Sequence, residues 1–338
     1  MTTLQEIAAA MVVPGQGILA ADESTGTIQK RFDSISVDCT ASNRCDYREM
    51  LFRSEGMKEA VSGVILFEET LDQTAADGTR LVDLISAAGA VPGIKVDKGA
   101  KPLAGHPGET VTEGLDGLRE RLASYHAKGA RFAKWRAVIS IGNDRPSWTA
   151  VKANAHGLAR YASLCQEAGI VPIVEPEVAM DGSDAVHDID TSADRSSWVL
   201  NTVFNELHEA KVDLEGMILK PNMVVPGQQC EKRASVEEVA EKTVACLMAE
   251  VPALVPGIAF LSGGQSDVEA TAHLNAMNAG YDMPWALTFS YGRAMQAAAL
   301  RAWCGKSENV PAAQVAFAHR AKMNGLAALG KWSDTLEA

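Results

Sequence analysis

Short apolar runs recur eight times along the chain, and each run ends in polar or charged residues. The runs cover residues 18–22, 61–69, 91–97, 132–139, 170–177, 216–220, 257–262 and 285–290. Segments with a helical pattern separate them, among them 113–128, 149–168, 196–210, 235–250 and 266–279. This alternation predicts a parallel β-sheet in which a helix follows each strand.

Local signals mark where several of these helices begin and end. The capping-box spacing of Ser235 with Glu238, and of Ser266 with Glu269, predicts helix starts directly after the sixth and seventh strands. Glycines that suit a helix C-terminus stand at positions 89, 129 and 169.

Eight strand-and-helix units without a Pro- or Ser-rich linker favour a single (β/α)8 barrel, the TIM barrel, over a doubly wound sheet. Such a barrel takes about 250 residues, whereas this chain has 338. We therefore expect an α/β protein with one domain over residues 1–338, extended by helices at its N- and C-terminal ends.

The overall charge limits the classes of partner. The net charge of −12 argues against a broad nucleic-acid or membrane surface, but it permits a local cationic pocket for a small anion. The six cysteines form no C-x-x-C pair and suit free thiols in a reducing cytosol. The N-terminus lacks a basic region, and Pro14, Gly15 and Gly17 interrupt its apolar stretch. We therefore expect a cytoplasmic protein without a signal peptide or membrane span.

Charged side chains gather at the strand ends, where barrels of this kind carry their reacting groups. These ends hold Asp22, Lys95, Asp97, Lys134, Arg136, Glu175, Glu177, Lys220, Ser262, Ser290 and Arg293. Because side chains two apart on a strand share a side, Lys134 lies with Arg136 and Glu175 with Glu177. We expect a ring of both signs at one mouth of the barrel, with a rim of ordinary salt bridges as the alternative.

Three of these residues, Lys95, Lys134 and Lys220, are lysines at the polar end of an apolar run. Desolvation and neighbouring cations would lower the pKa of such a lysine and leave a free amine. The pattern therefore indicates imine chemistry on a carbonyl substrate. The residues alone do not choose among the three lysines.

The last two strands end in similar sequences, Ser262-Gly-Gly-Gln265 and Ser290-Tyr-Gly-Arg293. Glycines let backbone N–H groups approach an anion, and the loops after strands seven and eight are the usual phosphate site of this fold. Arg293 adds a bidentate phosphate partner. We interpret these loops as a phosphate site; a plain strand-to-helix turn at Gly263 and Gly264 is the alternative.

Other motifs do not support a cofactor or a metal. The segment 15–20 fits G-x-G-x-x-A, but it precedes a strand instead of following one, so it does not predict a dinucleotide site. The seven histidines lack metal-binding spacing, and we expect them on the surface or on helices. The acidic stretch with Asp181, Asp184, Asp188 and Asp190 matches a calcium loop poorly, so a solvated loop is expected there.

Seven blocks at the strand ends resemble class I fructose-1,6-bisphosphate aldolase. They are Leu19-Ala-Ala-Asp-Glu-Ser-Thr-Gly26, Gly93-Ile-Lys-Val-Asp-Lys-Gly99, Phe132-Ala-Lys-Trp-Arg136, Ile173-Val-Glu-Pro-Glu177, Leu219-Lys-Pro-Asn-Met223, Phe260-Leu-Ser-Gly-Gly-Gln265 and Ser290-Tyr-Gly-Arg293. The resemblance implies reversible cleavage of fructose 1,6-bisphosphate to dihydroxyacetone phosphate and glyceraldehyde 3-phosphate in glycolysis and gluconeogenesis. It also implies a lysine imine without metal or cofactor, and a homotetramer.

The resemblance further implies a role for each matching residue. Lys220 would form the imine, and Lys134 would help keep it deprotonated. Glu175 would transfer protons with support from Glu177, and Asp22 would act at the C4 hydroxyl. The C1-phosphate site would hold Ser262, Gly263, Gly292 and Arg293, and the C6-phosphate side would hold Ser24, Thr27, Lys95 and, close by, Arg31. Arg136 and Ser290 are counted with the substrate-binding residues.

Two departures from the family and two alternatives remain at this point. Thr27 stands where serine is more common, and the C-terminal segment 331–338 has no terminal tyrosine, so tail-assisted proton transfer is not expected. A lysine aldolase or transaldolase acting on a monophosphate is one alternative. A catalytically idle scaffold is the other. The preference between fructose 1,6-bisphosphate and fructose 1-phosphate stays open.

Overall fold

The computed structural model describes residues 2–142, 144–182 and 184–337. Eight parallel strands close into a barrel in the order β1-β10-β9-β8-β7-β6-β3-β2. The strands are β1 (Gly17–Ala21), β2 (Val61–Leu66), β3 (Val91–Lys95), β6 (Phe132–Ser140), β7 (Val171–Ala179), β8 (Ile218–Leu219), β9 (Gly257–Phe260) and β10 (Ala286–Tyr291). The predicted (β/α)8 barrel is confirmed, and each of the eight apolar runs overlaps one of its strands.

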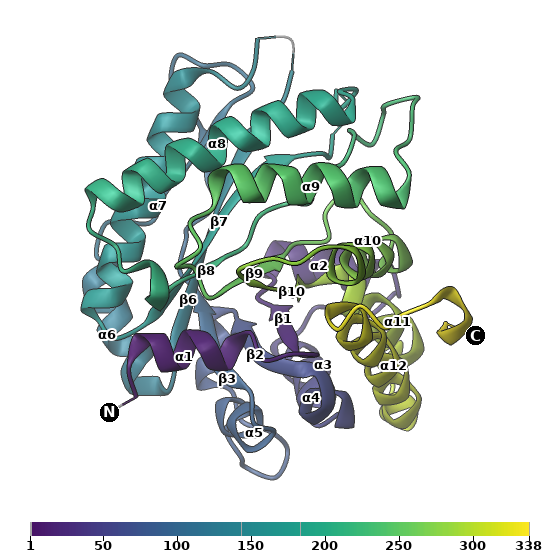
Figure 1. Cartoon of the computed structure of the whole chain (residues 1–338). Helices are drawn as coiled ribbons and strands as arrows, with labels where there is room; N and C mark the ends of the chain where they lie inside the picture. Colours follow the sequence, from purple (N-terminus) through teal and green to yellow (C-terminus); the bar gives the residue numbers. More distant parts are fainter. Residues whose placement is uncertain (1, 143, 183, 338) are drawn as a thin grey trace.

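Helices surround the barrel on its outer side (Figure 1). Three of them lie between β1 and β2, and one follows each later strand. They are α2 (Thr25–Asp33), α3 (Ala41–Phe52), α4 (Glu55–Ala60), α5 (Leu81–Ala87), α6 (Leu118–Lys128), α7 (Trp148–Glu167), α8 (Ile189–Glu209), α9 (Val236–Glu250), α10 (Asp267–Gly280) and α11 (Arg293–Trp303). Short 3-10 turns lie at η1 (Glu68–Asp72), η2 (Leu214–Gly216), η3 (Ser307–Asn309) and η4 (Asp334–Leu336).

The interior of the barrel is apolar at the end where the strands begin. Phe132, Ile173 and Ile218 are fully buried there, and Gly93 leaves room for the Phe132 ring, which a Cβ at position 93 would meet at 2.2 Å. Helix α1 (Leu4–Met11) closes this end, packs against β2, β3 and β7, and starts with a complete capping box at Thr3. The barrel therefore opens only where its strands end.

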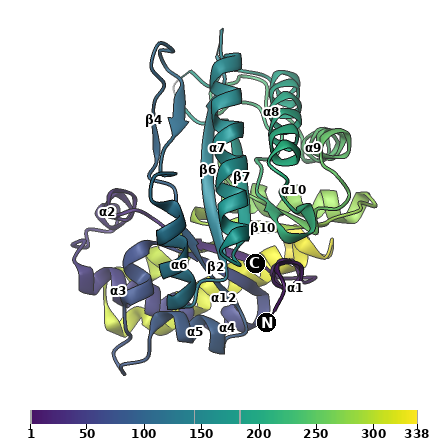
Figure 2. The same ribbon diagram turned by 90° about the vertical axis from the view of Figure 1, so that its left-hand side faces the viewer.

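Two additions lie outside the eight repeating units. A hairpin of β4 (Ala100–Pro102) and β5 (Thr110–Thr112) follows β3 and stands beside the end of β6 (Figure 2). Helix α12 (Val310–Ala328) packs against α4, α10 and α11. The sequence predicts the terminal helices but contains no recognised signal for the hairpin. No helix in the described residues is both long and apolar enough to cross a membrane.

Several predicted helix boundaries need correction. Helix α6 begins at Leu118, because residues 113–117 lead out of the hairpin, and α8 begins earlier than predicted, at Ile189. The capping box at Ser266 is complete and starts α10 as predicted. At Ser235 only the serine side chain caps the helix. That helix does not start directly after the sixth strand, because the segment 221–234 intervenes. Gly89, Gly129 and Gly169 have positive φ at helix ends, as predicted.

Candidate active site

A cavity of about 640 Å³ opens at the mouth of the barrel, within the range of small-molecule sites. All predicted site residues line it: Asp22, Ser24, Thr27, Arg31, Lys95, Lys134, Arg136, Glu175, Glu177, Lys220, Ser262, Gly263, Ser290, Gly292 and Arg293. They meet because the strands are parallel, so every strand end points to the same face. The charged ring expected from the sequence is therefore present.

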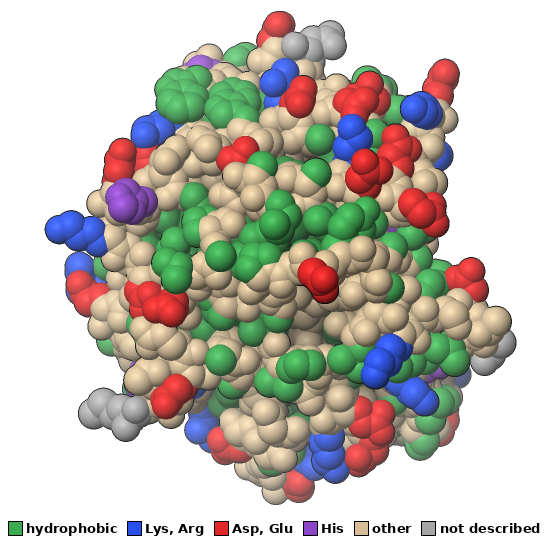
Figure 3. All heavy atoms as spheres, viewed as in Figure 1, with side chains coloured by type: hydrophobic (Ala, Val, Ile, Leu, Met, Phe, Trp, Pro, Cys, Tyr) green, Lys and Arg blue, Asp and Glu red, His purple; other side chains and the backbone are tan. Residues whose placement is uncertain are grey.

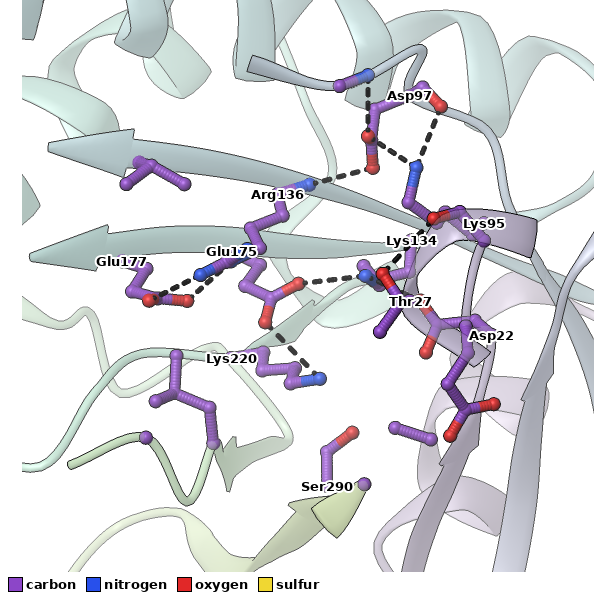
Figure 4. Close-up of a pocket in the computed structure, with 18 of the residues that line it drawn as sticks. Asp22, Thr27, Lys95, Asp97, Lys134, Arg136, Glu175, Glu177, Lys220 and Ser290 are labelled. Carbon is purple, nitrogen blue, oxygen red and sulfur yellow. Dashed lines mark hydrogen bonds and ion pairs between the residues drawn. The ribbon is translucent and has the colours of Figure 1, made fainter. Parts of the chain in front are cut away.

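Four charged side chains form a continuous group at the centre of this cavity (Figure 4). Lys134 Nζ lies 2.7 Å from Asp22 Oδ2 and 3.3 Å from Glu175 Oε2. Lys220 Nζ lies 3.2 Å from Glu175 Oε1. Glu175 thus bridges the two lysines, and we call these four residues the reacting centre.

The two lysines of the reacting centre differ in pKa. Burial lowers the pKa of Lys220, and repulsion from Lys134 lowers it further, against the attraction of Glu175 and Asp22. Burial acts on Lys134 in the same direction, but attraction to Asp22 and Glu175 prevails and raises its pKa. The expectation of a lowered pKa is therefore wrong for Lys134, because two carboxylates from other strands contact it. Lys220 is the better amine nucleophile.

Both carboxylates of the reacting centre favour the ionised form. Burial alone would raise the pKa of Asp22, but Lys134 and Lys220 lower it to about 2. Burial would also raise the pKa of Glu175, but the same two lysines lower it. Each carboxylate is therefore ionised at neutral pH.

Arg136 and Glu177 form a separate bidentate pair in the cavity wall. Arg136 Nε donates to Glu177 Oε2 and Arg136 Nη2 to Glu177 Oε1, each at 2.6 Å. The pair lies two residues beyond Lys134 and Glu175 on the neighbouring strands β6 and β7. Glu177 therefore braces the wall, and Arg136 keeps a half-exposed side chain toward the cavity.

The predicted C1-phosphate residues lie at the ends of the adjacent strands β9 and β10. Gly264 has a φ of +74°, and a side chain there would collide with Met180, which packs under the loop. Arg293 Nη2 donates to the carbonyl of Gln265 at 3.0 Å, which ties α11 to this loop. The Oγ of Ser290 is buried and has no hydrogen-bond partner among the described residues.

The predicted C6-phosphate residues come from two other elements: Ser24 and Thr27 follow β1, which pairs with β10, and Lys95 ends β3. Ser24 and Thr27 share a hydrogen bond of 3.1 Å between their hydroxyls at the start of α2. Lys95 Nζ lies 2.6 Å from Asp97 Oδ1. Arg31 departs from the expected grouping, because its guanidinium reaches Gly292, where a Cβ would lie 3.5 Å from Arg31 Nη2. It therefore stands between the two groups of residues.

Sequence reasoning did not assign a role to several charged residues that line the cavity. Glu23 is buried, pairs with Arg31 and accepts a hydrogen bond of 2.9 Å from Gln296. Its position next to Asp22 was the only available signal. The others are Glu68, Asp97, Lys98 and Asp181. In the sequence, Asp97 is evident only as a strand end and Asp181 only as part of the acidic stretch.

The motifs set aside in the sequence are accounted for by the structure. Gly17 begins β1 inside the G-x-G-x-x-A segment, so no dinucleotide turn forms there. No histidine lines the cavity among the described residues. His187 departs from the expectation, since it is half-buried and lies in a loop. The acidic stretch is not wholly a solvated loop either: Asp188 caps α8, Asp190 lies in it, and Asp181 lines the cavity.

Comparisons with known proteins agree with one another. The sequence pattern of the family described as glycolytic, fructose-bisphosphate aldolase class-I, matches residues 3–338. A probable fructose-bisphosphate aldolase class 1 from Xanthomonas axonopodis pv. citri is 57% identical over 97% of this chain and 98% of its own length. The cytosolic fructose-bisphosphate aldolase 4 from Arabidopsis thaliana is 55% identical over 96% of this chain and 82% of its own.

A solved structure resembles the whole barrel. It is fructose-bisphosphate aldolase from Plasmodium falciparum, in a ternary complex with TRAP and a small molecule inhibitor. The TM-score is 0.95 at 48% identity, over 98% of this chain and 95% of that one. With the barrel, the lysine of lowered pKa at its mouth and a family match over nearly all residues, the chain belongs to the class I fructose-bisphosphate aldolases.

Proposed function

We propose that the chain cleaves fructose 1,6-bisphosphate reversibly through an imine on Lys220. The observation that carries this assignment is the opposite electrostatics of the two central lysines. Lys220 has a lowered pKa and lies 3.2 Å from a carboxylate, whereas Lys134 has a raised pKa and remains an ammonium. A nucleophile and a fixed cation thus stand side by side, as imine chemistry requires.

Imine formation uses Glu175 as the proton carrier. A protonated Lys220 passes a proton to Glu175, which is ionised in the free enzyme and lies within reach. The free amine then attacks the C2 carbonyl, and the Lys134 ammonium stabilises the developing oxygen anion. That oxygen gains a proton as the attacking nitrogen loses one, which gives the neutral carbinolamine. The proton on Glu175 returns to the hydroxyl of the carbinolamine, which leaves as water and gives the protonated imine.

Carbon–carbon cleavage uses Asp22 as the base. With a pKa of about 2, Asp22 is ionised and takes the proton of the C4 hydroxyl. The C3–C4 bond breaks, the aldehyde forms, and the bonding electrons move into the imine to give an enamine. C3 of the enamine then takes up one proton while Asp22 gives up the one that it gained, so the proton count balances. Water hydrolyses the imine, which releases dihydroxyacetone phosphate and restores Lys220.

The two groups of phosphate residues favour a bisphosphate over a monophosphorylated sugar. Ser262, Gly263, Gly292 and Arg293 are assigned to the C1 phosphate, and Ser24, Thr27 and Lys95 to the C6 phosphate. We place Arg31 between them, and Ser290 offers a buried hydroxyl to the substrate. Binding at both ends orients the reacting carbons between Lys220 and Asp22.

Reductive trapping tests the imine assignment. Borohydride added with dihydroxyacetone phosphate reduces the imine to a stable secondary amine, and peptide mass analysis then locates it. We expect the adduct on Lys220. An adduct on Lys95 or Lys134, with Lys220 unmodified, contradicts the mechanism.

We also propose that the protein works in the cytoplasm as a single domain over residues 1–338 and as a homotetramer. Plant relatives named cytosolic support the compartment. A band of hydrophobic side chains crosses the middle of one face (Figure 3). Exposed hydrophobic residues include Met248 on α9 and Leu254 after it. Such a band suits contact between copies of the chain. Analytical ultracentrifugation at several protein concentrations measures the oligomeric state. A monomer at all of these concentrations contradicts the proposed homotetramer.

A further inference from the structure

The charges that line the cavity are balanced, although the proposed substrate carries two phosphates. Seven acidic residues line it: Asp22, Glu23, Glu68, Asp97, Glu175, Glu177 and Asp181. Seven basic residues face them: Arg31, Lys95, Lys98, Lys134, Arg136, Lys220 and Arg293. No large positive field fills the cavity, so phosphate affinity depends on which individual cations lack a carboxylate partner.

The cations at the two ends of the substrate differ in this respect. Lys95 Nζ lies 2.6 Å from the carboxylate of Asp97 and donates to its carbonyl at 2.9 Å. An ammonium has three N–H donors, so one is left for a phosphate. Arg293 has five donors, spends one on a backbone carbonyl, and has no carboxylate within 4 Å in the described part of the chain.

The Asp97 carboxylate is built into the cavity wall. Its side chain is 3% exposed. Its Oδ1 also accepts the backbone N–H of Gly99 at 3.1 Å, and its Oδ2 accepts that of Arg136 at 3.3 Å. Figure 4 shows these contacts together, across the cavity from Ser290. Because three contacts hold it, the carboxylate cannot easily swing away from Lys95 when a phosphate arrives.

We propose that Asp97 sets the substrate preference by weakening the phosphate site at Lys95. A phosphate bound to the remaining N–H of Lys95 meets the fixed negative charge of Asp97 a few ångströms behind the ammonium. The far phosphate is therefore held less tightly than the one at Arg293. This inference rests on the proposed function, which assigns Lys95 to the C6 phosphate.

A weakened far site matches the order in which the products form. After C3–C4 cleavage the dihydroxyacetone phosphate half remains covalently attached to Lys220, while glyceraldehyde 3-phosphate is held only by non-covalent contacts. Without the Asp97 carboxylate beside it, the Lys95 ammonium would bind glyceraldehyde 3-phosphate more tightly and slow its release. Asp97 therefore acts on release of the aldehyde as well as on binding of the bisphosphate, without touching the reacting carbons.

Substitution Asp97→Asn tests the proposal, because the amide oxygen still accepts from Lys95 and Gly99 while the charge is gone. It also removes the acceptor of the longer 3.3 Å hydrogen bond from the Arg136 N–H. We expect KM for fructose 1,6-bisphosphate to fall about five- to tenfold, and several-fold more than KM for fructose 1-phosphate. We also expect kcat to fall and product inhibition by glyceraldehyde 3-phosphate to strengthen. If the amide destabilises the fold, as judged by thermal melting, Asp97→Ser keeps a small acceptor and serves as the second variant.

Two controls separate this proposal from its foundation. Asp190→Asn removes the same charge from an exposed pair with Lys242, also at 2.6 Å, and leaves the kinetics unchanged. In a Lys95→Ala background, Asp97→Asn should no longer change the substrate preference. A rise in KM for the bisphosphate in folded Asp97→Asn overturns the proposal and would mean that Asp97 only holds Lys95 in position. If Lys95→Ala itself leaves the preference unchanged, the phosphate assignment in the proposed function fails instead.

Discussion

The two halves of the barrel interior share strands but differ in chemistry. The half that α1 closes is apolar, with Ala20, Phe132, Ile173 and Ile218 in its core. Two residues further along the chain from each stands one member of the reacting centre: Asp22, Lys134, Glu175 and Lys220. The period of a strand places each pair on the same side. A buried apolar side chain therefore anchors each charged one. The residues that stabilise the barrel and the residues of the reacting centre lie only two positions apart in the sequence.

The largest effect is expected where the charged half is broken. Lys220→Ala should lower kcat by roughly four powers of ten, because the proposed imine can no longer form. It should not lower stability. Burial lowers the pKa of Lys220 in the folded state, so the ammonium costs folding energy at neutral pH, and this cost falls as pH rises toward the unfolded pKa.

Thermal melting and turnover check this pair of expectations together. Lys220→Ala should melt no lower than the parent protein at neutral pH, and the difference between the two should shrink at higher pH. Loss of stability along with activity would mean that the charged half also holds the barrel together.

The apolar half should show the reverse pattern. Phe132→Ala removes a fully buried ring from the barrel interior and should cost about 3–5 kcal/mol of unfolding free energy. Lys134 lies only two residues from Phe132 on β6. Trapping on Lys220 therefore persists only if the β6 backbone keeps its position in the variant. We expect urea unfolding at a lower midpoint, with borohydride trapping on Lys220 retained in the folded fraction. Phe132→Leu, which leaves a smaller void, is the control.

A smaller effect separates the two ends of the cavity. Lys95→Ala should reduce kcat/KM for fructose 1,6-bisphosphate about tenfold, or ~1.4 kcal/mol, and affect fructose 1-phosphate less, since only the former has a C6 phosphate. Arg293→Ala should reduce both. Steady-state kinetics with the two substrates measure this. Equal losses with Lys95→Ala would assign Lys95 to the reacting centre or to structure.

Much of this architecture can be predicted from the sequence because its signals are local. A strand that ends in Lys-Pro-Asn or Val-Glu-Pro-Glu shows both its period and its chemistry within a few residues, and parallel pairing then brings the ends together. The pKa difference between Lys134 and Lys220 is not local. It depends on Asp22 and Glu175, which reach Lys134 from β1 and β7.

The missed elements have a different explanation, because their signals are local but weak. The β4–β5 hairpin has three-residue strands and its β4 is exposed, so it contains little periodic pattern. The early start of α8 depends on Asp188, whose side chain accepts the N–H of Thr191 as an N-cap. A polar cap of this kind adds nothing to the hydrophobic pattern. Elements that are short or polar therefore show little periodic pattern in a sequence.

The smallest expected effect tests the cause of the lowered pKa of Lys220. Lys134→Met keeps the length of the side chain and removes its charge. Repulsion from Lys134 lowers the pKa of Lys220, so its removal should raise that pKa. The fraction of free amine at a fixed pH then falls. NMR titration of isotope-labelled lysine follows the Lys220 pKa directly, without requiring turnover. Burial is the larger cause and stays in place, so the pKa should remain below its ordinary value. A pKa that falls instead would mean that Asp22 and Glu175, released from Lys134, take up protons and no longer attract the Lys220 ammonium.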